Sequence, residues 1–130
     1  LVATGLTTAV SAADFSSGNI DFVEPAYAIA NNPVSRVTIS GTTATCYSST
    51  RGNATTISIT QTLQVKKTTV WSNVKDATWT KTVNANSITM RNFKYDLDSG
   101  TYRLKSEYTL TAKDGTTETI TVYSLETSLS

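Results

Sequence analysis

The chain has 130 residues, with 11 basic and 10 acidic residues, a formal net charge of +1 at pH 7 and no histidine. This length suits one domain with a terminal extension, and the nearly neutral charge gives no reason to expect nucleic acid or an anionic membrane as a partner. The absence of histidine removes the Ser-His and Cys-His nucleophile pairs and the commonest zinc ligand. We therefore expect neither an enzyme nor a bound metal or cofactor.

The first 13 residues (LVATGLTTAVSAA) carry no charge and end in a small-x-small pattern. This pattern predicts the remnant of a secretory signal peptide, and hence a secreted or extracellular protein. A second interpretation is that the segment stays on the chain and packs against a neighbouring subunit. Thirteen residues are too few to span a bilayer, so no membrane span is expected.

Residues 14–33 show no sustained hydrophobic period, and Pro25 and Pro33 interrupt them. We expect an extended leader or linker here. From Ser35 onward the chain falls into short runs of alternating apolar and polar residues, separated by turn residues, and it is rich in threonine. This pattern predicts that residues 34–130 form an all-β, two-sheet antiparallel sandwich of about seven strands, with hydroxyl side chains on its outer faces.

Two of these runs are irregular. The run from Val70 to Trp79 is interrupted around Asp76. The apolar alternation that begins at Ile88 slips by one position before Phe93, which predicts a β-bulge near residues 91–92.

The Asp114-Gly115 pair marks a hairpin between the last two long strands. A two-residue loop would place Ile120 and Val122 on the face opposite Leu104 and Leu110. A three-residue loop pairs Ala112 with Thr116 and gathers these apolar residues, with Tyr108, on one face. Because burial needs one apolar face, we predict the three-residue loop, with Gly115 at positive φ.

The segment Asp98-Ser99-Gly100-Thr101-Tyr102-Arg103-Leu104 resembles the D-x-G-x-Y-x-C motif of immunoglobulin domains, with Leu104 in place of the cysteine. The resemblance implies an immunoglobulin-like sandwich in which Tyr102 is the tyrosine of a tyrosine corner, its ring buried and its hydroxyl bonded to backbone just upstream. Cys46 takes the position of the family's first cysteine, and Ile59 or Leu63 fills the volume of its usual tryptophan. The layout as a whole is similar to small secreted immunoglobulin-like domains of Gram-positive bacteria that have no defined activity. Expected core residues are Cys46, Ile59, Leu63, Tyr102 and Leu104.

No group of residues predicts catalysis. The acidic residues of the final hairpin, Glu107, Glu118 and Glu126, are interpreted as solvated surface groups, and Cys46 as a buried thiol without a partner to activate it. Aromatic residues are the stronger signal, because several of them on one exposed face would stack against a sugar. The candidate binding residues are Trp71, Trp79, Tyr95 and Tyr123.

We therefore expect a secreted, non-catalytic module for binding, adhesion or structural assembly through a sheet face or edge. Its partner would be a surface glycan or a protein, and self-association is a further expectation. The alternative is a carbohydrate-binding module that uses exposed Trp71 and Trp79. The competing interpretation of the aromatic residues is that they fill the core and the ends of the sheets.

Overall fold

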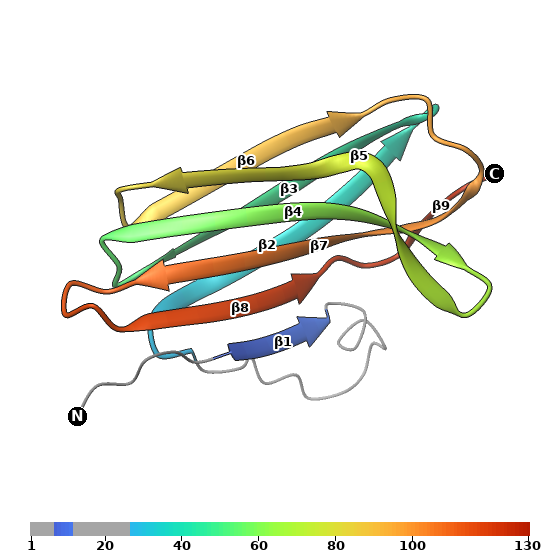
Figure 1. Ribbon diagram of the computed structural model, residues 1–130. Coiled ribbons are helices and arrows are strands. Elements are labelled where there is room, and N and C mark those ends of the chain that lie inside the picture. The colour runs from blue at the N-terminus through green and yellow to red at the C-terminus, as the bar shows by residue number, and fades with distance from the viewer. Residues whose placement is uncertain (1–6, 12–26) are drawn as a thin grey trace.

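The computed structural model describes residues 7–11 and 27–130, which form two β-sheets packed face to face (Figure 1). The larger sheet has six strands in the order β1-β8-β7-β4-β5, with β9 also paired to β7, and the smaller has three in the order β2-β3-β6. No helix occurs in the described part of the chain. The predicted all-β, two-sheet architecture is thus confirmed. The strands are Thr7–Ser11 (β1), Ala30–Ser40 (β2), Thr43–Gly52 (β3), Thr56–Lys67 (β4), Val70–Val83 (β5), Ser87–Lys94 (β6), Gly100–Thr111 (β7), Thr117–Tyr123 (β8) and Thr127–Leu129 (β9).

The β7–β8 hairpin has the predicted three-residue loop. The backbone N–H of Ala112 donates to the carbonyl of Thr116, and Gly115 has a φ of 89°. The ladder that follows, from Thr111↔Thr117 to Lys105↔Tyr123, places Ile120 and Val122 on the buried face with Leu104, Tyr108 and Leu110. Burial of one apolar face therefore selects the register, as expected.

The core lies between the sheets in two neighbouring clusters. One is built around Ile57, Ile59 and Tyr108, and the other around Leu63 and Leu104. All five residues expected in the core are buried: Cys46, Ile59, Leu63, Tyr102 and Leu104. The Tyr102 hydroxyl donates to the carbonyl of Asp98 at 2.6 Å, which is the bond that a tyrosine corner requires.

Hydroxyl groups line the outer face of the larger sheet. Ser58 lies 3.1 Å from Thr82, and Thr60 lies 3.2 Å from Thr80, in each case between β4 and β5. Such cross-strand hydroxyl pairs suit a pleated surface in contact with water. This outer face accounts for part of the abundance of threonine in the sequence.

Three sequence-based expectations differ from the structure. First, β2 begins at Ala30, before the expected domain boundary at residue 34, because Ile29 and Ala30 are buried in the core. Second, β6 pairs with β3 without a register shift, so no bulge occurs near residues 91–92, and Phe93 is exposed. Third, Glu118 is fully buried and accepts hydrogen bonds from the backbone N–H groups of Ala28, Ile29 and Ala30.

The interruption predicted around Asp76 is present. Asp76 has a φ of 56°, and the register of β4 against β5 shifts between Thr62 and Gln64. This irregularity allows Trp71 and Trp79 to lie on opposite faces of the sheet.

Part of the predicted signal segment is a strand in the structure. β1 runs parallel to β8, from the Thr7↔Thr119 pair to the Ser11↔Tyr123 pair, at the edge of the larger sheet (Figure 1). The rest of the predicted signal segment and residues 14–26 of the predicted leader lie outside the described residues.

Candidate binding face on the smaller sheet

The outer face of the smaller sheet carries a row of three large polar side chains, one from each strand. On β2, Arg36 lies between Ser35 and Val37, which are both buried, and is therefore directed away from the core. The same alternation turns Tyr47 of β3 and Arg91 of β6 outward. Tyr47 is the register partner of both arginines, so the row crosses the sheet as Arg36-Tyr47-Arg91.

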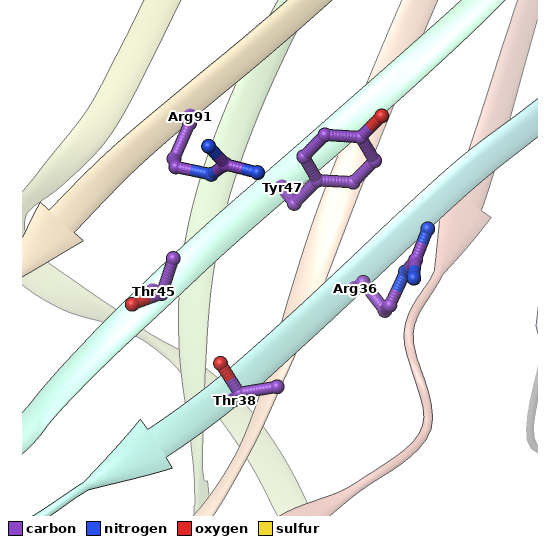
Figure 2. Close-up of a pocket in the computed structure, with 5 residues that line it drawn as sticks. All are labelled: Arg36, Thr38, Thr45, Tyr47 and Arg91. Carbon is purple, nitrogen blue, oxygen red and sulfur yellow. The ribbon is translucent and has the colours of Figure 1, made fainter.

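Both guanidinium groups approach the tyrosine ring. The Cζ atom of Arg36 lies 5.0 Å from the centre of the Tyr47 ring, and that of Arg91 lies 5.4 Å from it. Figure 2 shows the ring between the two arginines, with Thr38 and Thr45 next to them along their strands. These five residues line a hollow of about 340 Å³. We call this surface the Arg-Tyr-Arg face.

The charged residues on the three strands of this sheet are all basic. Strands β2, β3 and β6 contain no Asp or Glu, but they carry Arg36, Arg51, Arg91 and Lys94. The ion pair present among the described residues joins Lys105 to Glu107 on β7 at 3.8 Å, so no carboxylate of that part of the chain pairs with Arg36 or Arg91. The fold thus gathers on one sheet an excess of positive charge that the nearly neutral sequence conceals.

Two exposed aromatic rings extend the face along β6. Phe93 is 47% exposed and Tyr95 is 61% exposed, and their rings stack with centres 6.4 Å apart and planes 24° apart. Phe93 is the register partner of Thr45, which lines the hollow. Tyr95, one of the predicted binding residues, therefore lies close to the Arg-Tyr-Arg face.

The other predicted binding residues lie elsewhere. On the larger sheet, the Arg103 guanidinium lies 4.3 Å from the Trp71 ring centre and 4.1 Å from the Tyr123 ring centre. Arg103 also donates through Nε to Gln64 at 2.8 Å. Trp79 packs against both core clusters. Trp71 and Trp79 are both half-buried and do not share a surface.

The arrangement on the smaller sheet suits the binding of anions. A guanidinium group stacked on an aromatic ring keeps its N–H groups free at the edge, where they can contact a carboxylate, sulfate or phosphate in a bidentate manner. Neighbouring strands are about 4.8 Å apart, so the backbones of Arg36 and Arg91 are separated by roughly 10 Å. The face can therefore contact two anionic groups of one ligand at once.

Sequence reasoning missed Arg36, Tyr47, Phe93 and Arg91. Arg36, Tyr47 and Arg91 each lie next to a buried residue in a strand, so strict alternation indicates their outward direction. Phe93 lies between two half-buried residues, Asn92 and Lys94, and lacks that signal. That the three strands are neighbours was not available from the sequence, because β6 pairs with β3 across the intervening β4 and β5.

Cys46 is fully buried, and burial raises the pKa of its thiol to about 12 from 9.0. Its thiol is therefore protonated at neutral pH and cannot act as a nucleophile there. Among the residues described, no three His, Cys, Asp or Glu side chains are grouped so that they could hold a metal ion.

We expect Cys46 to resist thiol reagents in the native protein at pH 8 and to react stoichiometrically in guanidinium chloride, as measured with Ellman's reagent. Because the folded-state pKa lies above the unfolded-state value, this thiol favours the folded state below pH 9 and loses that contribution as the pH rises toward 12. Rapid labelling of the native chain at pH 8 would contradict the buried position of Cys46.

The chain was compared with protein-family models, curated proteins and solved structures, and none of them matches it. Within the described residues, no helix has the length and apolar character needed to cross a membrane.

Proposed function

We propose that this protein is a secreted, non-catalytic binding module with an immunoglobulin-like sandwich, and that it adheres to an acidic polysaccharide through the Arg-Tyr-Arg face. The observation that carries the proposal is the pair of guanidinium groups, 5.0 and 5.4 Å from one tyrosine ring, on a sheet whose strands lack acidic residues. The immunoglobulin-like assignment is supported by the tyrosine corner at Tyr102, and by Cys46 and Leu104 sharing one core cluster. Secretion is supported by the uncharged residues 1–13.

Several features of this surface suit an acidic glycan. The hollow is lined by two arginines, two threonines and a tyrosine, so it offers cationic and hydroxyl groups and no aliphatic side chain. The threonine hydroxyl groups can bond to sugar hydroxyls, and the exposed Phe93–Tyr95 pair offers rings against which a sugar can stack. Cations and stacking rings are thus combined on one face.

The same features are less favourable for single-stranded nucleic acid. The Tyr47 ring is occupied by two guanidinium groups, so it offers no free face for a base.

The proposal is tested by titrating the full chain with dextran sulfate and with polygalacturonate in a calorimeter, at two salt concentrations. We expect the Arg36→Ala/Arg91→Ala double variant to bind at least about tenfold more weakly, because two charge-assisted contacts are lost. We expect Tyr47→Ala to bind more weakly as well, although its charge is unchanged, because the arginines lose the ring that orders them.

The matched control is Lys75→Ala/Lys113→Ala, which removes the same charge from β5 and the β7–β8 loop. This control should bind like the parent chain, apart from a small general effect of charge. Equal binding by the parent and the Arg36→Ala/Arg91→Ala variant would overturn the proposal. Tighter binding of single-stranded DNA than of either polysaccharide would also overturn it, in favour of a nucleic-acid ligand.

A further inference from the structure

The exposed edges of the two sheets differ in how they are protected against pairing with another strand. On β5 the edge carries Lys75, Asp76 and Lys81. On β2 it carries Pro33 and Arg36 and a register irregularity between Asn31 and Val34. On β6 it carries Arg91 and Lys94. Charged residues, proline and bulges are the devices by which proteins prevent edge-to-edge association.

Strand β8 lacks these devices. Its sequence, TETITVY, contains one charged residue, Glu118, and that side chain is fully buried. The remaining residues are β-branched or aromatic, a composition that favours strand pairing. In the described part of the chain, β8 is covered on this side by the five-residue β1 alone. The edge of β8 therefore favours pairing with a further strand, and in the structure that strand is β1.

The connection between β1 and the sandwich is long. Residues 12–26 join β1 to Tyr27, and a chain of that length can extend to about 50 Å. Glu118 fixes the start of the sandwich by accepting the N–H groups of Ala28 to Ala30 at one end of β8, and Ser11 pairs with Tyr123 at the other. The separation along β8 is roughly 17 Å at about 3.4 Å per residue. The connection is thus long enough for β1 to reach a second molecule.

We propose that the β8 edge is a docking site for a second copy of this chain, which occupies it with its own residues Thr7–Ser11. Exchange of an identical strand between copies keeps every hydrogen bond of the parallel ladder and therefore has a low energetic cost. The inference takes the interpretation in which residues 1–13 stay on the chain, and it therefore replaces the signal-peptide interpretation on which the proposal of secretion rests. It does not rest on the Arg-Tyr-Arg face, which lies on the other sheet. Linked copies would present several such faces to one polymer and bind it with greater avidity.

Disulfide trapping tests the exchange directly, because Ala9 and Thr121 are register partners. The full-length Ala9→Cys chain, labelled with ¹⁵N, is mixed with unlabelled full-length Thr121→Cys chain, unfolded, refolded together and oxidised. Cα atoms of register partners are close enough for a disulfide, and Cys46 is buried and does not compete. We expect a mixed disulfide between labelled and unlabelled chains, identified by intact mass.

Two controls make the result specific. A Thr78→Cys chain, with its cysteine on the β5 edge, replaces Thr121→Cys and should give little mixed product. Val10→Pro added to the Ala9→Cys chain should abolish the crosslink, because proline cannot donate to the ladder. The same Val10→Pro substitution in the parent chain should shift its sedimentation from associated species to the monomer.

Three results would overturn the inference. The first is an Ala9→Cys/Thr121→Cys double variant that forms only an intrachain disulfide at every protein concentration, while the mixed pair forms none. The second is the absence of any disulfide in both experiments. The third is a mature chain, isolated from its natural source, whose mass shows that it begins at Asp14.

Discussion

Replacing Glu118 with alanine is expected to lower the free energy of unfolding by about 4 kcal/mol. The Glu118 carboxylate is fully buried and accepts from Ala28 N at 2.7 Å, from Ile29 N at 3.1 Å and from Ala30 N at 2.9 Å. Alanine would leave three N–H groups without an acceptor, and each buried donor left in this way costs about 1–3 kcal/mol. Equilibrium unfolding in guanidinium chloride measures the change.

The matched control for this substitution is Glu107→Ala, on the neighbouring strand β7. Glu107 is 41% exposed and pairs with Lys105 at the surface, so its loss should change the free energy of unfolding by less than about 1 kcal/mol. The loss of unfolding free energy in Glu118→Gln should lie between those of Glu118→Ala and Glu107→Ala. One side-chain oxygen remains to accept a hydrogen bond, but the new N–H₂ group is placed opposite a backbone N–H, which is also a donor. Equal stabilities of Glu118→Ala and Glu107→Ala would show that the carboxylate does not hold the start of β2.

The Glu118 contact also bears on the proposed binding face. It fixes the residues that lead into β2, and β2 carries Arg36. We therefore expect Glu118→Ala to increase hydrogen exchange at Ala28 to Ala30 more than at the β7–β8 hairpin. A buried acid on the larger sheet thus positions a strand of the smaller one.

Residue alternation and turn residues are sufficient to predict the elements whose partners are close in sequence. Alternation predicts the seven strands from β2 to β8 but not β1 or β9, and the requirement for one apolar face predicts the loop at Gly115. The tyrosine corner is also local, because Tyr102 bonds to Asp98 four residues upstream. In each case the residues that decide the structure lie within one turn or one hairpin.

The wrong predictions from the sequence concern residues whose neighbours in the fold are distant in sequence. The alternation of large apolar residues predicts that Phe93 is buried, and therefore also predicts a bulge just before it. The structure instead exposes Phe93 next to Tyr95. The rarity of buried acids predicts that Glu118 is solvated, but in the structure it is bonded to the backbone of Ala28 to Ala30, which lies 88 or more residues away in sequence. The Arg-Tyr-Arg face similarly depends on the pairing of β3 with β6.

A second long-range feature, a chain of buried polar groups, joins the two sheets at the centre of the core. Gln61 of β4 is fully buried, and its Nε2 lies 2.8 Å from the Ser48 hydroxyl and 3.2 Å from the carbonyl of Met90, both on the smaller sheet. Its Oε1 accepts from Asn92 at 2.9 Å. Ser48 in turn lies 2.6 Å from the Ser106 hydroxyl of β7. No buried side-chain N or O atom of the described residues lacks a partner, so the network is fully satisfied.

The effect of substituting Gln61 on the free energy of unfolding should therefore depend on how much side-chain volume and how many hydrogen bonds the new residue removes. We expect Gln61→Ala to lower the free energy of unfolding by about 3 kcal/mol, since it leaves both a cavity and polar groups with fewer partners. Gln61→Leu fills most of the volume and should cost about half as much. Thr60→Ala, one residue away on the outer face, should cost less than about 1 kcal/mol, because water replaces its bond to Thr80. Urea unfolding of the three variants gives the comparison. A Gln61→Leu chain as stable as the parent would show that the Gln61 amide makes no net contribution to holding the sheets together.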